Sequence, residues 1–104
     1  MKITETRVIE RKLIMLFNDS KNNVNKEKNI EAQTVIKKII EVFDLISVFN
    51  NVSHTTIVKK LYFNKNNIMV KGTRIIAREL FMDEKTLYRL RLKYCMVIKE
   101  ILTF

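Results

Sequence analysis

Residues 73–95 of the chain have the sequence TRIIARELFMDEKTLYRLRLKYC, and this stretch decides the fold. Its first ten residues have the apolar spacing of a short helix, and its last dozen have the spacing of the start of another. Only Phe81, Met82 and Asp83 lie between them, which is too little chain for anything but a tight turn. The stretch therefore predicts two helices that meet at a sharp corner.

Local signals mark where each of these two helices begins. Gly72 gives the chain freedom to turn, and Thr73 is suited to cap the first helix because its hydroxyl can accept a hydrogen bond from a free backbone N–H. Asp83 is expected to cap the second helix, and Glu84 in its first turn suits the positive end of the helix dipole. The residues expected to face inward are Ile76, Ala77, Leu80, Met82, Leu87, Leu90, Tyr94, Val97 and Ile101.

The rest of the chain also favours helices. Apolar residues recur at helical spacing over residues 4–19 and 30–49, and Ser53 is placed to cap a third helix. Residues 18–29 are nearly all polar and rich in asparagine, so we expect an exposed loop there. With one glycine and no proline, the chain lacks the turn residues that an all-β fold requires.

We therefore predict a single all-α domain of about five helices over residues 1–104, with the helical corner near its end. Its two halves differ in charge. Residues 1–52 carry nine basic and seven acidic residues, for a net charge of +2, whereas residues 53–104 carry eleven and four, for +7. A basic half suggests a polyanionic partner, most often nucleic acid. The first half is expected to support the fold or join protomers, and the second to carry the corner.

Cysteine usage and hydropathy favour a cytoplasmic location. Cys95 is alone, so the chain can form no internal disulfide and no cysteine metal site. No segment reaches the roughly 18–20 uninterrupted apolar residues that a membrane span requires. The first residues also lack the apolar core of a signal peptide. We expect a cytoplasmic protein without a membrane partner.

Residues 30–49 form the most apolar segment, with an apolar arc wider than one helix needs for a single partner. Two explanations remain open. The segment is the central helix of the domain, as small bundles commonly have, or part of the arc is kept for another chain, which would allow a homodimer. The face in question consists of Val35, Ile39, Val42, Ile46 and Phe49.

The apolar spacing over residues 76–90 is that of the buried positions of a helix-turn-helix. The longer segment resembles the C-terminal helix-turn-helix of sigma factors and, more closely, small phage regulators of the ArpU and RinA type. Glycine commonly stands where Phe81 lies, because that position often takes a positive φ, so a bulky residue indicates a modified turn or a different boundary. The resemblance covers about residues 53–104 and rests on Ile76, Ala77, Leu80, Thr86, Tyr88, Arg89 and Lys93.

The resemblance implies a sequence-specific DNA-binding transcriptional regulator of phage or mobile-element origin. The N-terminal residues of a recognition helix face base edges in the major groove, whereas basic residues of the preceding helix lie near phosphates. The candidate base-reading residues are Lys85, Thr86, Tyr88 and Arg89. The candidate phosphate contacts are Lys71, Thr73, Arg74, Arg78, Arg91 and Lys93.

Other function classes have less support in the sequence. His54 begins a helix and is expected to serve as a cap or surface residue, and Cys95 is expected to be packed rather than nucleophilic. We therefore expect no enzyme, no cofactor and no metal site. Three alternatives remain: a helical module that binds RNA polymerase or another regulator through residues 35–49, a DNA-packaging helper of the small-terminase kind, and a basic helix on anionic lipid.

Overall fold

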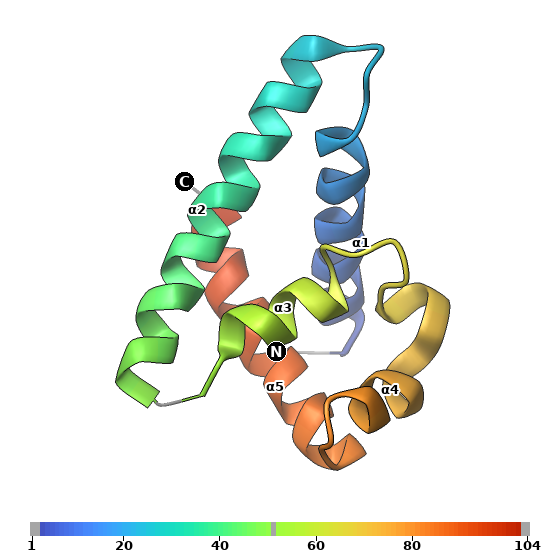
Figure 1. Ribbon diagram of the computed structural model, residues 1–104, viewed down its shortest axis with the longest axis vertical. Coiled ribbons are helices and arrows are strands. Elements are labelled where there is room, and N and C mark those ends of the chain that lie inside the picture. The colour runs from blue at the N-terminus through green and yellow to red at the C-terminus, as the bar shows by residue number, and fades with distance from the viewer. Residues whose placement is uncertain (1–2, 51, 103–104) are drawn as a thin grey trace.

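The computed structural model describes residues 3–50 and 52–102, and these residues form five α-helices with no strand (Figure 1). The prediction of an all-α domain of about five helices is therefore confirmed for the described residues. None of their helices is long and apolar enough to cross a membrane. The helices are α1 (Ile3–Ser20), α2 (Lys26–Asn50), α3 (His54–Leu61), α4 (Ile68–Glu79) and α5 (Glu84–Leu102).

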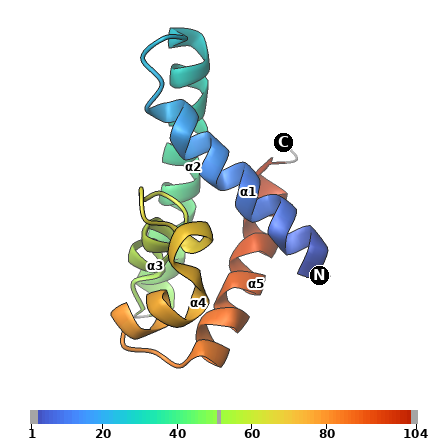
Figure 2. The same cartoon turned by 90° about the vertical axis from the view of Figure 1, so that its right-hand side faces the viewer.

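The connection between α1 and α2 lies at one end of the molecule, and the corner between α4 and α5 lies at the other (Figures 1 and 2). Helices α1 and α2 form an antiparallel hairpin, and α5 runs from the corner back to pack against α1. Helix α3 packs against both α2 and α4. The two halves of the sequence therefore share one core, which contains Leu13, Ile39, Phe43, Val58, Leu61, Tyr62, Ile76, Leu87, Cys95 and Ile98.

The loop expected over residues 18–29 is confirmed only for residues 21–25. Helix α1 continues to Ser20 and α2 begins at Lys26, so the connection is short. Asparagine side chains cap the two helices that flank this connection. At the start of α2, Asn25 Oδ1 accepts a hydrogen bond from the Lys28 N–H at 3.1 Å. At the end of α1, the Ser20 carbonyl accepts a hydrogen bond from Asn29 Nδ2 at 2.7 Å. Asparagine is a strong helix N-cap, so the polar composition here marks a helix start.

The apolar face of α2 that was considered for a partner turns mostly inward. Ile39 is completely buried, and Val35 and Ile46 pack against the core. Val42 is half-buried, and only Phe49, which is 85% exposed, lies open to solvent. The central-helix explanation accounts for most of this face, because α2 packs against both α1 and α3.

The start of α3 is capped from another helix. His54 begins α3 directly after Ser53, as predicted, but the Ser53 hydroxyl makes no capping hydrogen bond and instead contacts Thr56 Oγ1 at 2.6 Å. Ser47 of α2 takes the capping role, because its Oγ accepts from the backbone N–H groups of His54 at 3.0 Å and Thr55 at 3.4 Å. The predicted Ser53 cap was therefore wrong.

Segment α4 contains two helical pieces divided at Gly72: the first begins at Ile68, before the predicted start, and the second follows Gly72 at the predicted position. The N-cap of the segment is Asn67, whose Oδ1 accepts from the Met69 N–H at 2.9 Å, rather than Thr73. Gly72 takes φ 80° and ψ 167° inside the helix, a conformation that glycine adopts without strain, so it does provide the expected turn in the chain. Thr73 follows the kink, and its hydroxyl accepts a hydrogen bond from Arg91 at 2.7 Å.

The end of α4 has the hydrogen bonds of a Schellman motif. The Phe81 N–H donates to the Arg78 carbonyl at 3.1 Å, and the Met82 N–H donates to the Ala77 carbonyl at 3.0 Å. Phe81 takes a positive φ of 55°, while its side chain is 98% exposed. Ala77 is buried and Met82 packs against the core. The predicted tight turn at residues 81–83 is thus confirmed, and α5 starts directly after it.

Candidate nucleic-acid interface

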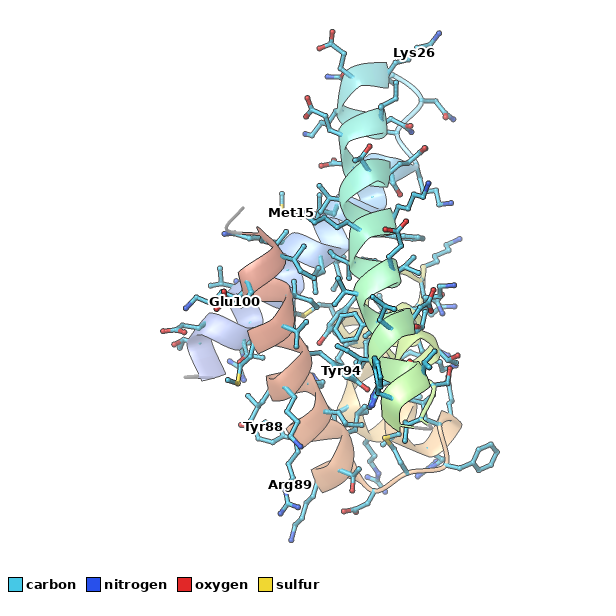
Figure 3. All side chains as sticks on the ribbon, turned by 90° about the vertical axis from the view of Figure 1, so that its left-hand side faces the viewer. Met15, Lys26, Tyr88, Arg89, Tyr94 and Glu100 are labelled. Atoms are coloured by element: carbon cyan, nitrogen blue, oxygen red, sulfur yellow. The ribbon has the colours of Figure 1, made fainter. Side chains whose placement is uncertain are left out.

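The first two turns of α5 project from the corner end of the molecule. Tyr88 and Arg89 extend outward from this end of the helix, whereas Tyr94 points into the interior (Figure 3). Leu87 and Tyr94 are buried on the inner face of α5, which holds the helix against the core. The four candidate base-reading residues are all exposed, and they are Lys85, Thr86, Tyr88 and Arg89.

An open hollow of about 360 Å³ lies between the start of α5 and the kink of α4. Tyr88 forms an apolar wall, and Lys85 and Arg89 place two positive charges beside it. Thr73 reaches the hollow from α4, so the kink at Gly72 brings a hydroxyl next to the basic face of α5. The lining residues are Thr73, Glu84, Lys85, Tyr88 and Arg89.

A smaller hollow of about 180 Å³ shares Thr73 and Tyr88 with the first and extends it onto α1. Its lining includes Arg7, an exposed basic residue of α1. Sequence reasoning missed Arg7, and no local pattern could have found it, because only the packing of α1 against α5 brings it next to Tyr88. Arg7 therefore adds a positive charge at the edge of the basic face.

The candidate phosphate residues fall into two groups. Arg74, Arg78 and Lys93 are exposed, and no acidic side chain within the described residues forms an ion pair with them. Lys71 is half-buried and pairs with Glu79, which it shares with Lys60. Hydrogen bonds from these two lysines lower the pKa of the Glu79 carboxyl below its usual value. A phosphate would compete with Glu79 for Lys71, whereas the first group is available to a ligand.

Arg91 lies in an internal ion pair. Its Nε and Nη2 donate to the two carboxylate oxygens of Glu10 at 2.8 and 2.7 Å, and its Nη1 donates to Thr73 Oγ1 at 2.7 Å. The Glu10 side chain is completely buried, and that of Arg91 is 15% exposed. A buried carboxylate requires such a partner. The expected phosphate contact by Arg91 is therefore corrected to a structural role, and Thr73 serves as its hydrogen-bond acceptor.

Comparison of the chain with protein-family models, curated proteins and solved structures found no match.

Glu10 is the centre of a buried polar network that sequence reasoning missed. The Tyr62 hydroxyl donates to Glu10 Oε2 at 2.6 Å, and burial raises the pKa of Tyr62 well above its usual value, with Cys95 and Glu10 adding to the effect. A signal was present, because Glu10 follows Thr6 by four residues and precedes Leu13 by three, which places it on the inner face of α1. The network joins α1 to the residue that follows α3 and to the middle of α5.

Of the two side chains considered for catalysis, Cys95 is buried and His54 is half-buried. His54 Nδ1 lies 2.7 Å from the Tyr94 hydroxyl, and burial together with the nearby Lys93 lowers the pKa of His54. Cys95 is completely buried, and burial with the nearby Glu10 raises the pKa of its thiol to about 12, so it lacks the thiolate of a nucleophile. In the described part of the chain, no group of three His, Cys, Asp or Glu side chains could hold a metal ion.

Proposed function

We propose that the protein is a sequence-specific DNA-binding transcriptional regulator in which α4 and α5 act as a helix-turn-helix. The observation that carries the proposal is the exposed start of α5, where Lys85, Tyr88 and Arg89 project together from one end of the molecule. In a helix-turn-helix, the N-terminal residues of the second helix meet base edges in the major groove. These side chains have the position and the chemistry for that role.

The turn between the two helices supports the same proposal. Phe81 takes the positive φ that glycine usually supplies at this point of a helix-turn-helix. Its exposed ring lets the backbone adopt that conformation without disturbing the core. The part of α4 after Gly72 is short, and the corner directs α5 away from it. A resemblance of residues 53–104 to phage regulators favours a phage or mobile-element origin.

Each exposed residue of α5 has a distinct task in this proposal. Arg89 pairs with the O6 and N7 atoms of a guanine, and Thr86 contacts a thymine methyl or a base edge. Tyr88 lies between the basic face and the hollow shared with α1, so it contacts a base or a sugar-phosphate. The residues assigned to phosphates are Arg7, Arg74, Arg78 and Lys93.

Selection of bound sequences from a random pool of double-stranded DNA tests the proposal directly. We expect enrichment of one short motif, because base-edge contacts distinguish the four base pairs in the major groove. Affinity for that motif should fall steeply with salt, with a slope of log K on log salt of about −3.6 if four phosphates are neutralised. A matched pool of single-stranded DNA is the control.

Two results would count against this function. DNA binding without any enriched motif would show that the basic face attracts DNA only non-specifically and does not read a sequence. Absence of DNA retention at low salt, in a protein shown to be folded, would exclude the interface altogether, since about four exposed cations should bind duplex at low ionic strength.

A homodimer belongs to the same proposal, because paired recognition helices read two half-sites. Four apolar residues at the end of α2 and just after it remain exposed although most of the α2 face is buried. Sedimentation equilibrium at micromolar concentration, with and without the selected DNA, measures the association, and a monomer in both samples contradicts it. The exposed residues are Leu45, Val48, Phe49 and Val52.

A further inference from the structure

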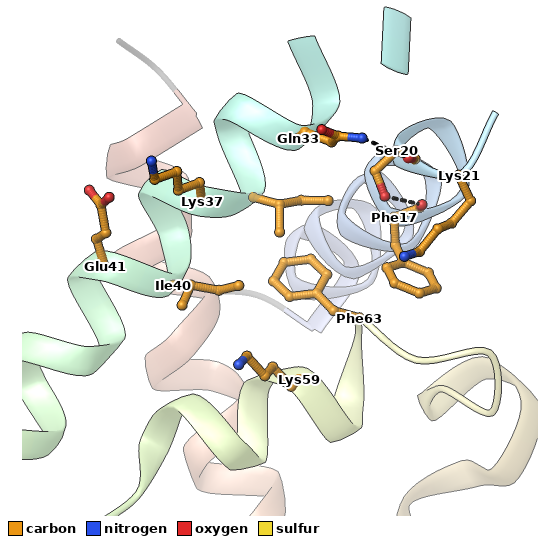
Figure 4. A pocket seen from close by; sticks show the side chains of 10 residues that line it. Phe17, Ser20, Lys21, Gln33, Lys37, Ile40, Glu41, Lys59 and Phe63 are labelled. Atoms are coloured by element: carbon orange, nitrogen blue, oxygen red, sulfur yellow. Dashed lines mark hydrogen bonds between the residues drawn. The ribbon is translucent and has the colours of Figure 1, made fainter. Parts of the chain in front are cut away.

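A second concave surface lies between α1, α2 and α3, and we name it the α1–α3 groove (Figure 4). Its volume is about 560 Å³, which is within the range of binding sites for compact ligands and peptide side chains. None of its residues belongs to the proposed DNA interface. It is lined by Phe17, Ser20, Lys21, Gln33, Ile36, Lys37, Ile40, Glu41, Lys59 and Phe63.

The floor of the groove is apolar and already ordered. Phe17 of α1 and Phe63, just after α3, are stacked with ring centroids 6.5 Å apart and planes inclined by 28°. Ile36 and Ile40, one turn apart on α2, form the facing wall. All four side chains are only half-buried. A partner that covered them would gain hydrophobic stabilisation without a rearrangement of the aromatic pair.

The rim of the groove is basic. Lys21, Lys37 and Lys59 are exposed and come from three separate segments, against the single acid Glu41. The ammonium group of Lys21 lies 5.5 Å from the centroid of the Phe17 ring, a cation–π contact that keeps it at the edge of the apolar floor. Within the described residues, none of the three lysines forms an ion pair. The rim therefore attracts an anionic partner.

The groove and the DNA interface occupy different parts of the molecule. The groove lies along the half of the α1–α2 hairpin that leads to its connection, and the start of α5 lies at the opposite end (Figures 1 and 4). A partner in the groove would leave Lys85, Tyr88 and Arg89 uncovered. The two surfaces can thus be occupied at the same time.

We propose that the α1–α3 groove binds a short acidic amphipathic helix of a partner protein. Apolar side chains one turn apart on such a helix would cover Phe17, Phe63 and the α2 wall, as in other complexes in which a helix lies in a groove. Its acidic residues would pair with the three rim lysines. A second copy of this chain is disfavoured as the occupant, because its net charge of +9 opposes the basic rim.

The test is selection of binders to the full chain from a displayed library of random peptides of about four helical turns. We expect enriched peptides that combine apolar residues at i and i+4 with several Asp or Glu, and that become helical on binding. The variant with Lys37→Glu and Lys59→Glu should bind the best peptide about tenfold more weakly, since two exposed ion pairs are replaced by repulsion. Replacing the acids of that peptide by lysine should restore its binding to the variant.

A matched control has the same change of charge outside the groove. Lys38 lies beside Lys37 on α2 but does not line the groove, and Lys65 is an exposed residue after α3. The variant with Lys38→Glu and Lys65→Glu should keep peptide affinity within about twofold, because the exchanged charges are screened. The two variants should bind DNA with the same affinity. A loss of peptide binding in the groove variant would then be independent of the proposed DNA interface.

Three results would overturn the proposal. Equal loss of peptide binding in the two double variants would show general attraction to a basic protein. Failure to enrich acidic apolar peptides would show that the groove does not recognise this class of partner. Binding of anionic phosphatidylglycerol vesicles that depends on Lys37 and Lys59, without peptide binding, would assign the groove to a lipid surface instead.

Discussion

Helix α5 contains two basic regions that differ completely in their surroundings. On its outer face, Lys85, Arg89 and Lys93 are exposed and have no acidic partner within the described residues. On its inner face, Arg91 lies only two residues from Arg89 but binds the buried carboxylate of Glu10. The same residue type is thus left exposed to solvent in one case and holds the fold together in the other.

The difference shows that a count of positive charge does not locate an interface. The C-terminal half carries eleven basic residues, but Lys60 and Lys71 are paired with Glu79 and Arg91 with Glu10. The unpaired and exposed residues are the ones that can neutralise phosphates. Substitutions at single residues can therefore test whether the outer face of α5 binds DNA and the inner face stabilises the fold.

The largest expected effect is on the inner face. Glu10→Ala leaves the Arg91 guanidinium partly buried without its carboxylate, and we expect it to lower the free energy of unfolding by about 3–5 kcal/mol. Urea unfolding followed by circular dichroism measures this loss. Arg91→Ala should cost a similar amount, whereas Arg89→Ala should change stability by less than about 0.5 kcal/mol. If Arg91→Ala and Arg89→Ala both change the free energy of unfolding only slightly, the ion pair on the inner face does not stabilise the fold as proposed.

A double substitution sharpens this result. Replacing both Glu10 and Arg91 by Met removes the two buried charges together and should recover most of the stability lost by either single change. Recovery would show that the single variants fail because one charge is left without its partner. If the double variant is as unstable as Glu10→Ala, packing of the long side chains, rather than charge, accounts for the cost.

The second effect concerns binding at the outer face. Arg89→Ala should weaken binding to the selected DNA site by about 1–3 kcal/mol and relax the preference at one base pair, with little change on random DNA. Arg74→Ala is the matched control, because loss of a phosphate contact should weaken specific and random DNA alike and reduce the salt slope by about one contact. Fluorescence anisotropy on both DNA types measures the affinities. If folded Arg89→Ala keeps the same base preference, the outer face of α5 does not read bases and is only a solvent-exposed charged surface.

The third effect concerns the turn that sets the direction of both faces. Phe81 has a positive φ and an exposed ring, so Phe81→Gly should relieve backbone strain without loss of packing and stabilise the protein by about 1 kcal/mol. Phe81→Ala retains the strained backbone and should be nearly neutral. Thermal unfolding of the three proteins measures the order. A loss of stability in the glycine variant would show that the ring contributes to the corner.

The smallest effect concerns His54, whose Nδ1 lies 2.7 Å from the Tyr94 hydroxyl and whose pKa is influenced by the charge of Lys93. Burial and the charge of Lys93 lower the pKa of His54 in the folded protein below 6.5. The unfolded chain therefore takes up the proton first as the pH falls, so this histidine makes the protein less stable as the pH drops below about 6.5. His54→Gln should remove that part of the pH dependence. Identical stability profiles of the two proteins between about pH 5.5 and 7.5 would contradict it.

Local patterns in the sequence determined the helices and the corner. The spacing of Leu87, Leu90 and Tyr94 identified the inner face of α5, because a period of 3.6 residues places such side chains on one side of a helix. The short segment at Phe81 also had to be a turn, and the structure confirms it. These features depend on neighbours along the chain, so a single sequence contains the information for them.

Only the tertiary structure decided which residues of those helices meet. It paired Arg91 with Glu10, brought Arg7 next to Tyr88 and buried Ile39. A helical period shows which residues share a face, but not which face of another helix that face will contact. Glu10 and Arg91 are far apart in the sequence, and the burial that makes their ion pair obligatory arises only when α1 packs against α5. The helical period can place Arg91 on the inner face of α5, but its pairing with Glu10 was decided by packing, which no local pattern encodes.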